Sequence, residues 1–373
     1  MITRFDDYCV HQTAQPVAEP SQSDRNFYDR YWFNGFDDSG SYVFEVGLGL
    51  YPNRHVMDGH FSVAMGDRQV AFHGSRRAPR ERSDTSVGEL TLSVEEPLRV
   101  LRVVLAENEH GIACDLRFYA ASAPHREPPS VLHDDGHLIM HTTWFTQFGY
   151  CHGWFSVDGT RYEVTRAYGT RDRSWGVRPV GEPQVGAPGL LNSKPAVYWI
   201  WCPINWGDFC TQMGTFEDAE GKPTQVSADR LPLYDDPGRI PEGAPQGLVA
   251  MAAVEHQLTY HPGTRFPAEA RMAFRSVDGE AYNLTLTPLQ RFQTLGVGYN
   301  HPEWGHGFWR GELETAREDW KLAAIDPGAP EFIHVHQVVR AEMNGRVGMG
   351  TLESLILGPH ERSGLRGLFD GAA

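Results

Sequence analysis

The stretch GTRDRSWGVRP, residues 169–179, gathers three arginines, an aspartate and a tryptophan near the middle of a chain of 373 residues. Successive side chains of an extended strand point to opposite faces of a sheet. On a strand, Arg171, Arg173 and Trp175 would therefore share one face, and Asp172 would point to the other. The stretch predicts a strand with a cationic face and an aspartate behind it.

The length of the chain predicts the number of domains, and its net charge indicates which kinds of partner it binds. The chain exceeds the roughly 250–300 residues at which a single hydrophobic core stops growing, so we expect two domains. It carries 33 basic and 48 acidic residues, for a formal net charge of −15. This excess of negative charge argues against nucleic acid or an anionic membrane surface as the main partner. A hydrophobic small molecule is the expected ligand. The sequence does not determine the oligomeric state, and a homodimer is one possibility.

Strand patterns dominate both halves of the chain and predict an all-β protein. Strands do not alternate with helices along the chain, as they would in a protein with a parallel sheet. We therefore expect two consecutive antiparallel β-barrel or sandwich domains with a few short helices. A small barrel of about eight strands can enclose one ligand. The segments that alternate at period two, or that run as short β-branched and aromatic stretches, are 41–51, 60–74, 88–122, 152–169, 196–206, 209–216, 248–261, 271–289 and 332–357.

Turn and loop residues divide these strands. Asp-Gly and Asn-Gly pairs supply the positive φ of a tight hairpin turn, which predicts hairpins at 158–159, 278–279 and 344–345. The segment 179–195 holds four prolines and three glycines, so we place the domain boundary there, with domains 1–185 and 186–373. The segment 312–323 has apolar residues at helical spacing and is predicted to be a helix packed on a barrel.

The cysteines and the N-terminus favour a reduced, cytoplasmic protein. The five cysteines are odd in number and form no C-x-x-C motif. The N-terminal residues MITRFDDYCV lack the basic and apolar regions of a signal peptide. No apolar stretch is long enough to span a membrane. An apolar ligand would therefore have to be held inside a pocket.

Asp172 is the first candidate for chemistry. An aspartate that faces an apolar interior needs a partner or a raised pKa, and a carboxyl kept neutral in this way can act as a general acid. Arg171 and Arg173 would hold it in place, although paired arginines would lower its pKa. The alternative is an Arg/Asp network that fastens the two domains together. In that case a histidine, His152 or His306, would have to be the acid.

Tryptophans are the candidates for an apolar binding surface. Trp199 and Trp201 share one strand face and lie close in sequence to Trp206. Indole faces can line an apolar pocket and stabilise a developing cation. Trp144 and Trp175 are weaker candidates of the same kind. For all of them, a place in a hydrophobic core is the alternative.

The histidines suggest an acid–base pair more than a metal site. His334 and His336 have the spacing of two metal ligands on one strand face. The sequence shows no compact third ligand near them and no H-E-x-x-H motif, so no metal and no cofactor is expected. His152 leads into the hairpin that ends near Asp172, and the two could form an acid–base pair across it.

These features resemble one known family. With RDRSWG at 171–176, a β-hairpin before it and a second β-rich half opening on WIWCPINW at 199–206, the chain resembles the carotenoid 1,2-hydratase/AttH-like superfamily. The stretch DRNFYDRYWFNGFD at 24–37 is similar to the N-terminal region of bacterial members. The resemblance covers nearly the whole chain and implies two lipocalin-like β-barrel domains. Its specific motif is confined to 171–176.

The resemblance also implies a function. Relatives include hydratases that add water to an isoprenoid double bond and pericyclases that fold a polyene in an aromatic pocket, without a metal or redox cofactor. We therefore expect a hydratase or dehydratase acting on a terpenoid- or steroid-like molecule, with Asp172 as acid and His152 as its partner or as the base that orients water. The alternatives are a pericyclase or isomerase, a carrier of hydrophobic ligands, and a carbohydrate-active β-sandwich.

Overall fold

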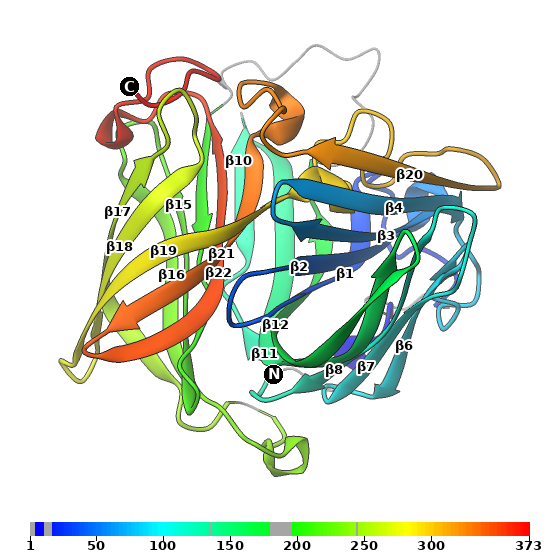
Figure 1. The fold of residues 1–373 in the computed structure, drawn as a ribbon, viewed down its shortest axis with the longest axis horizontal. Helices are drawn as coiled ribbons and strands as arrows, with labels where there is room; N and C mark the ends of the chain where they lie inside the picture. The colour runs from blue at the N-terminus through cyan, green and yellow to red at the C-terminus, as the bar shows by residue number, and fades with distance from the viewer. Residues whose placement is uncertain (1–3, 11–16, 135, 180–195, 244) are drawn as a thin grey trace.

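The computed structural model describes residues 4–10, 17–134, 136–179, 196–243 and 245–373. Two antiparallel β-barrels lie side by side, the first nearly closed and the second closed (Figure 1). The helices among the described residues are 3₁₀ turns of three or four residues. The prediction of an all-β, two-barrel protein is confirmed. The proposed boundary at 185/186 lies outside the described residues and stays a prediction.

The first sheet holds 13 strands among the described residues, and its main path runs in the order β20-β4-β3-β2-β1-β12-β11-β8-β7-β6-β5. Its long strands β11 and β12 form the hairpin that carries the stretch 169–179. The strands are β1 (Phe27–Phe36), β2 (Val43–Tyr51), β3 (Val56–Met65), β4 (Arg68–Arg77), β5 (Ser86–Val87), β6 (Leu90–Glu96), β7 (Val100–Leu105), β8 (Ile112–Ala120), β9 (His125–Arg126), β10 (Ser130–Asp134), β11 (His137–Val157), β12 (Thr160–Val177) and β20 (Leu313–Lys321).

The second sheet holds nine strands among the described residues and closes on itself, because β13 pairs with β22 and β15 pairs with β16. The seam between β16 and β17 is short, with Asp229 and Arg230 opposite Ala250 and Val249. The strands are β13 (Val197–Trp201), β14 (Ile204–Asn205), β15 (Phe209–Glu217), β16 (Pro223–Pro232), β17 (Val249–Tyr260), β18 (Pro267–Ser276), β19 (Ala281–Gln293), β21 (His334–Met343) and β22 (Arg346–Leu357).

The helix predicted at 312–323 is wrong. Residues 313–321 form β20, which pairs antiparallel with β4 and so joins a segment from the second half of the chain to the first barrel (Figure 1). Arg317 and Trp320 lie opposite Phe72 and Gln69 of β4. The local residues favour a helix, but pairing with the otherwise open edge of β4 supplies a ladder of hydrogen bonds that a surface helix would not replace.

The three predicted hairpins are present. Asp158 and Gly159 join β11 to β12, and both have positive φ, as do Asn344 and Gly345 between β21 and β22. Between β18 and β19 only the glycine of the Asp-Gly pair at 278–279 has positive φ, so this connection is not the same two-residue turn.

Replacing Gly345 tests this turn chemistry. A Cβ at Gly345 would meet no atom within 4 Å, so the cost of a side chain there is conformational and not steric. Gly345→Val is expected to lower the free energy of unfolding by about 1–2 kcal/mol, because its φ of 80° is unfavourable for L-residues. Gly345→Asn should cost less, since asparagine tolerates this region. Equal losses for the two variants in urea unfolding would contradict this explanation.

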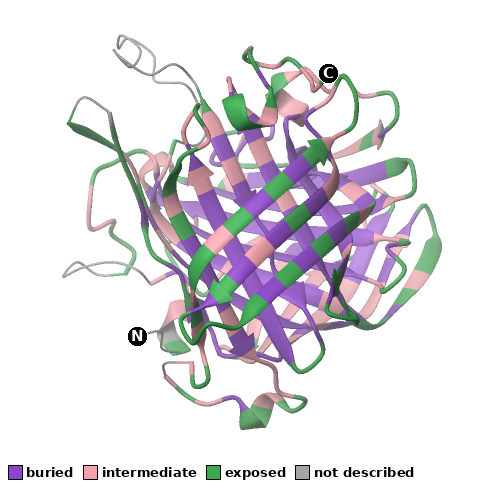
Figure 2. Ribbon diagram, turned by 90° about the vertical axis from the view of Figure 1, so that its left-hand side faces the viewer, coloured by how far each residue is buried: buried purple, intermediate pink, exposed green. Residues whose placement is uncertain are grey.

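Side chains fill the interior of both barrels. Tyr31 and Phe33 of β1 join the apolar core of the first barrel, whereas Trp32 between them joins a separate apolar cluster with Trp201 of the second barrel. Successive side chains of β1 point to opposite faces of the sheet, so some pack in the core of the first barrel and others pack between the two barrels. Buried residues run along the strands of both sheets (Figure 2). The cavity described below lies between the two barrels.

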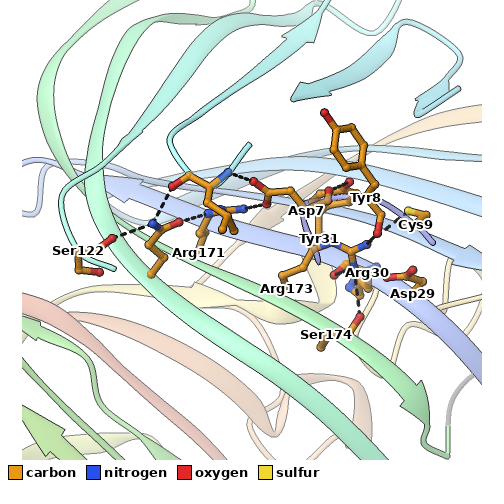
Figure 3. A network of polar contacts seen from close by, with 12 residues as sticks. Asp7, Tyr8, Cys9, Asp29, Arg30, Tyr31, Ser122, Arg171, Arg173 and Ser174 are labelled. Carbon is orange, nitrogen blue, oxygen red and sulfur yellow. Dashed lines mark hydrogen bonds and ion pairs between the residues drawn. The ribbon is translucent and has the colours of Figure 1, made fainter. Parts of the chain in front are cut away.

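The N-terminal segment packs onto the first barrel through buried ion pairs. Arg171 Nη1 donates to Asp7 Oδ1 at 2.5 Å, and Arg173 donates to Asp29 and to the backbone oxygen of Tyr8 (Figure 3). The Arg/Asp network that was one prediction for this stretch exists, but it lies within the first half of the chain and does not join the two barrels.

All five cysteines are buried free thiols. Among the described residues, no helix has the length and apolar character needed to cross a membrane.

Candidate active site

A cavity of about 840 Å³ lies between the two barrels. Its walls come from β1, β11 and β12 of the first barrel and from β13, β15, β21 and β22 of the second. The volume falls within the range of roughly 300–1,000 Å³ that is usual for sites of small ligands. The cavity is therefore large enough for an apolar molecule of terpenoid or steroid size.

Asp172 faces this cavity from β12. Strand β12 lies between β1 and β11, where Asp172 pairs in register with Trp32 on one side and Thr146 on the other. Period-two alternation sends Asp172 and Ser174 to the cavity and the neighbouring arginines to the first barrel. The two faces predicted for this strand are thus present.

The surroundings of Asp172 raise the pKa of its carboxyl group into the neutral range. Burial and the nearby carboxylate of Glu127 raise the pKa of Asp172 to about 7, against the opposing effects of Arg178 and Ser174. Glu127 is itself buried, and its Oε1 accepts a hydrogen bond of 2.6 Å from Thr146. Burial also raises the pKa of Glu127. Two carboxyl groups close together in a dry site oppose each other's ionisation.

Arg171 and Arg173 do not pair with Asp172. They are fully buried on the opposite face of β12, with Asp7 and Asp29 as their ion-pair partners (Figure 3). Their contacts therefore do not support the prediction that Arg171 and Arg173 hold Asp172 in place. Their placement also removes the objection that flanking arginines would lower the pKa of Asp172.

Arg178 and His306 form a polar corner of the cavity. Arg178 Nη2 lies 3.2 Å from Nδ1 of His306, while Nε2 of His306 lies 2.9 Å from the backbone oxygen of Val297. A guanidinium and a carbonyl fix the tautomer, because the first can only donate and the second can only accept. Burial, with the nearby guanidinium groups, holds the pKa of His306 well below its usual value. His306 is therefore neutral, with both ring nitrogens engaged, and is a poor candidate for the acid.

Aromatic side chains line much of the cavity. Trp144, Trp199 and Trp201, all predicted as binding residues, are among them, and the two from β13 share one strand face as expected. Trp206 lies elsewhere: it belongs to the core of the second barrel, where its Nε1 donates to Thr211. Trp175 is half-buried and does not line the cavity.

His152 lies outside the cavity. It is exposed at the β-bulge of β11, between Cys151 and Gly153, where its Nδ1 accepts a hydrogen bond from the backbone N–H of Arg166. Its ring packs edge-on against Tyr119. The structure does not bring His152 and Asp172 together as an acid–base pair, because Asp172 lies opposite Thr146, well along the hairpin from His152.

A chain of histidines and carboxylates links the two barrels across one wall. Glu45 of β2 accepts hydrogen bonds from Trp32 Nε1 at 2.9 Å and from His336 Nδ1 at 2.6 Å. His334 Nε2 lies 2.7 Å from Glu353 Oε1, and His336 Nε2 lies 3.6 Å from the same oxygen. Burial alone would lower the pKa of His336, but Glu45 and Glu353 outweigh it and raise the pKa to about 10.

Glu45, Glu353 and Arg178 are site residues that the sequence analysis missed. Glu353 lies directly opposite His336 on the neighbouring strand β22, and Glu45 comes from the other barrel. A charged residue at an otherwise strand-like position was the one available signal, because such residues are rarely buried without a partner. Their partners could not be identified without the strand register.

The pH dependence of stability tests the environment of Asp172. A carboxyl whose pKa is raised to about 7 in the folded protein retains its proton where the unfolded chain has lost it, so folding is penalised as pH rises from about 4 to about 7. Asp172→Asn removes this penalty. We expect its free energy of unfolding, relative to the wild type, to increase over this pH range and then level off. A constant difference in urea unfolding from pH 4 to 8 would show that Asp172 titrates normally.

Comparisons with known proteins agree with this architecture. A protein described as an AttH from Nitrosomonas europaea superposes with a TM-score of 0.54 at 12% identity, over 88% of this chain and 92% of that one. Kievitone hydratase from Nectria haematococca superposes with a TM-score of 0.53 at 12% identity, over 92% and 93%. The predicted resemblance to the AttH-like fold is confirmed, at identities that show the fold alone.

Sequence comparison gives a family but no function. No curated protein matches the chain. A match over residues 2–366 shows that the chain belongs to the family of unknown function DUF8625.

Proposed function

We propose that this protein is a lyase that adds water to, or removes water from, an apolar small molecule in the cavity between the barrels. The observation that carries the proposal is Asp172, an aspartate with a pKa raised to about 7 on the wall of a cavity lined by tryptophans. A general acid works best when its pKa lies near the working pH. The pKa of Asp172 meets this condition.

The proposed reaction uses the acidic side chain of Asp172 and the tryptophans that line the cavity. Asp172 donates its proton to one carbon of a double bond, and the positive charge develops on the other carbon. Trp32, Trp144 and Trp199 line the cavity, and electron-rich indole rings can stabilise this charge. Water then bonds to the cationic carbon, and the proton that it releases restores the Asp172 carboxyl. Dehydration of an alcohol is the reverse sequence.

The fold is consistent with this reaction. Kievitone hydratase, whose name states a hydration, shares the two-barrel architecture over nearly the whole length of both chains. Fold alone does not determine a reaction, so the proposal depends on Asp172 and the aromatic wall.

The test is to incubate the purified protein with a mixed library of terpenoids and steroids and to analyse bound and released molecules by mass spectrometry. A released product that differs from its parent by one water is the expected result. A product of unchanged mass but altered retention time would indicate an isomerase or pericyclase instead. A retained ligand without any product would indicate a carrier, and either outcome would overturn the lyase proposal.

A further inference from the structure

One wall of the cavity carries a cluster of two histidines and one glutamate. His334, His336 and Glu353 each offer one ligand atom, and these three atoms lie within 4.8 Å of one another. All three residues line the cavity, and the two histidines are only 3% and 4% exposed. We propose that His334, His336 and Glu353 bind a divalent transition-metal ion, with Zn²⁺ as the best fit.

The strand register explains how three ligands converge. His334 and His336 are two residues apart on β21 and therefore share a face. Glu353 lies opposite His336 on the antiparallel strand β22. Neighbouring strands hold directly opposite side chains close together, so the backbone itself sets the spacing of the ligands.

The distances suit one shared ion. Ligand atoms bound at about 2.0–2.1 Å to a tetrahedral zinc ion lie about 3.3 Å apart. The 3.6 Å between His336 Nε2 and Glu353 Oε1 is close to this separation and too long for a good hydrogen bond. The 2.7 Å between His334 Nε2 and Glu353 Oε1 must open by about 0.6 Å. The bound ion takes the place of the proton between these two atoms, and that proton moves to Nδ1 of His334.

Glu45 prepares His336 as a ligand. Its carboxylate accepts the Nδ1–H of His336 at 2.6 Å and is itself held by Trp32. This contact leaves Nε2 as the ring atom that faces the cluster, and that buried nitrogen has no hydrogen-bond partner in the part of the chain that the structure describes. Metal binding displaces the proton that His336 carries on Nε2 and releases it to the solvent. Histidines that bind metals commonly donate their other ring N–H to a carboxylate, which orients the ring and makes it a stronger ligand. Two imidazoles and one carboxylate match the His₂Glu ligand set of zinc sites that leave a fourth position open.

A second cluster in the protein does not have this arrangement. His73, His301 and Glu318 also lie close together. However, Nδ1 of His301 accepts hydrogen bonds from the backbone N–H groups of Glu303 and Trp304, which places the ring proton on Nε2. That proton points at Glu318 Oε2, 2.6 Å away. Its Nε2 therefore has no lone pair to offer, and Glu318 provides a matched control.

The experiment uses the full-length protein, freed of metal with a chelator and titrated with Zn²⁺ alone. We expect one ion per chain by calorimetry and elemental analysis. His336→Gln and Glu353→Gln should weaken binding by more than about 100-fold, and Glu45→Gln by about 10–100-fold. Glu318→Gln should bind as the wild type does. Circular dichroism checks that each variant is folded.

Two results would overturn the inference: no stoichiometric Zn²⁺ binding by the wild type, or equal affinity in folded His336→Gln. Anomalous diffraction at the zinc edge from wild-type crystals needs no variant. A peak between the two Nε2 atoms and Glu353 is expected, and a peak elsewhere would refute the assignment. The inference goes beyond the water-transfer reaction and does not rest on it, because binding is measured without an organic ligand.

Discussion

Asp172→Asn is expected to lower kcat of the water-transfer reaction by roughly 10²–10⁴-fold, the usual contribution of a general acid. Asparagine keeps the size and polarity of the side chain but cannot give a proton to carbon. The substrate Kd should change little, because the tryptophans that line the cavity remain in place. The measurement is the initial rate of product formation on the substrate that the library identifies, alongside Kd for that substrate.

A control variant distinguishes loss of the general acid from a nonspecific effect of replacing an aspartate in the first barrel. Asp115→Asn changes an aspartate of the same barrel that pairs with Arg102, away from the cavity, and should leave kcat unchanged. The wild-type kcat/KM should also fall as pH rises above about 7, since Asp172 then loses its proton. Full activity in Asp172→Asn, together with a pH profile like that of the wild type, would remove Asp172 from the mechanism.

Arg173→Met is expected to lower the free energy of unfolding by about 3–5 kcal/mol. Arg173 is 0% exposed, and its guanidinium pairs with buried Asp29 and donates to two backbone oxygens at 3.0 Å (Figure 3). Removing it takes away the buried ion pair with Asp29 and leaves that carboxylate in a low-dielectric environment. One of the two oxygens belongs to Tyr8, so the N-terminal segment should also become easier to cleave. Urea unfolding and limited proteolysis measure the two effects.

Two further variants test whether the buried charge of Asp29 causes the loss of stability in Arg173→Met. Replacing both partners, in Arg173→Met/Asp29→Leu, should recover part of the lost stability, because no charge is then left buried alone. Arg161→Met removes an exposed partner of Glu163 and should have little effect. If Arg173→Met were as mild as Arg161→Met, the network would not anchor the N-terminal segment.

Local patterns predicted much of the fold. Alternation along 171–174 correctly separated the arginines from Asp172, and Asp-Gly and Asn-Gly pairs located the hairpins. These features depend only on neighbouring residues in an extended chain. The segment 313–321 shows the limit of this approach. Its residues favour a helix, yet the edge of β4, far away in the sequence, makes it a strand.

The sequence by itself determined that the protein is all-β, that its strands pair as antiparallel hairpins, and that Asp172 faces away from its arginine neighbours. Only the tertiary structure decided that the cavity lies between the barrels, that Trp199 and Trp201 line it while Trp206 does not, and that Glu353 lies beside His336. The physical reason is the range of the interactions. Strand direction and turns follow from adjacent residues, whereas a cavity wall is assembled from outward faces of strands that only the register and the packing of two barrels bring together.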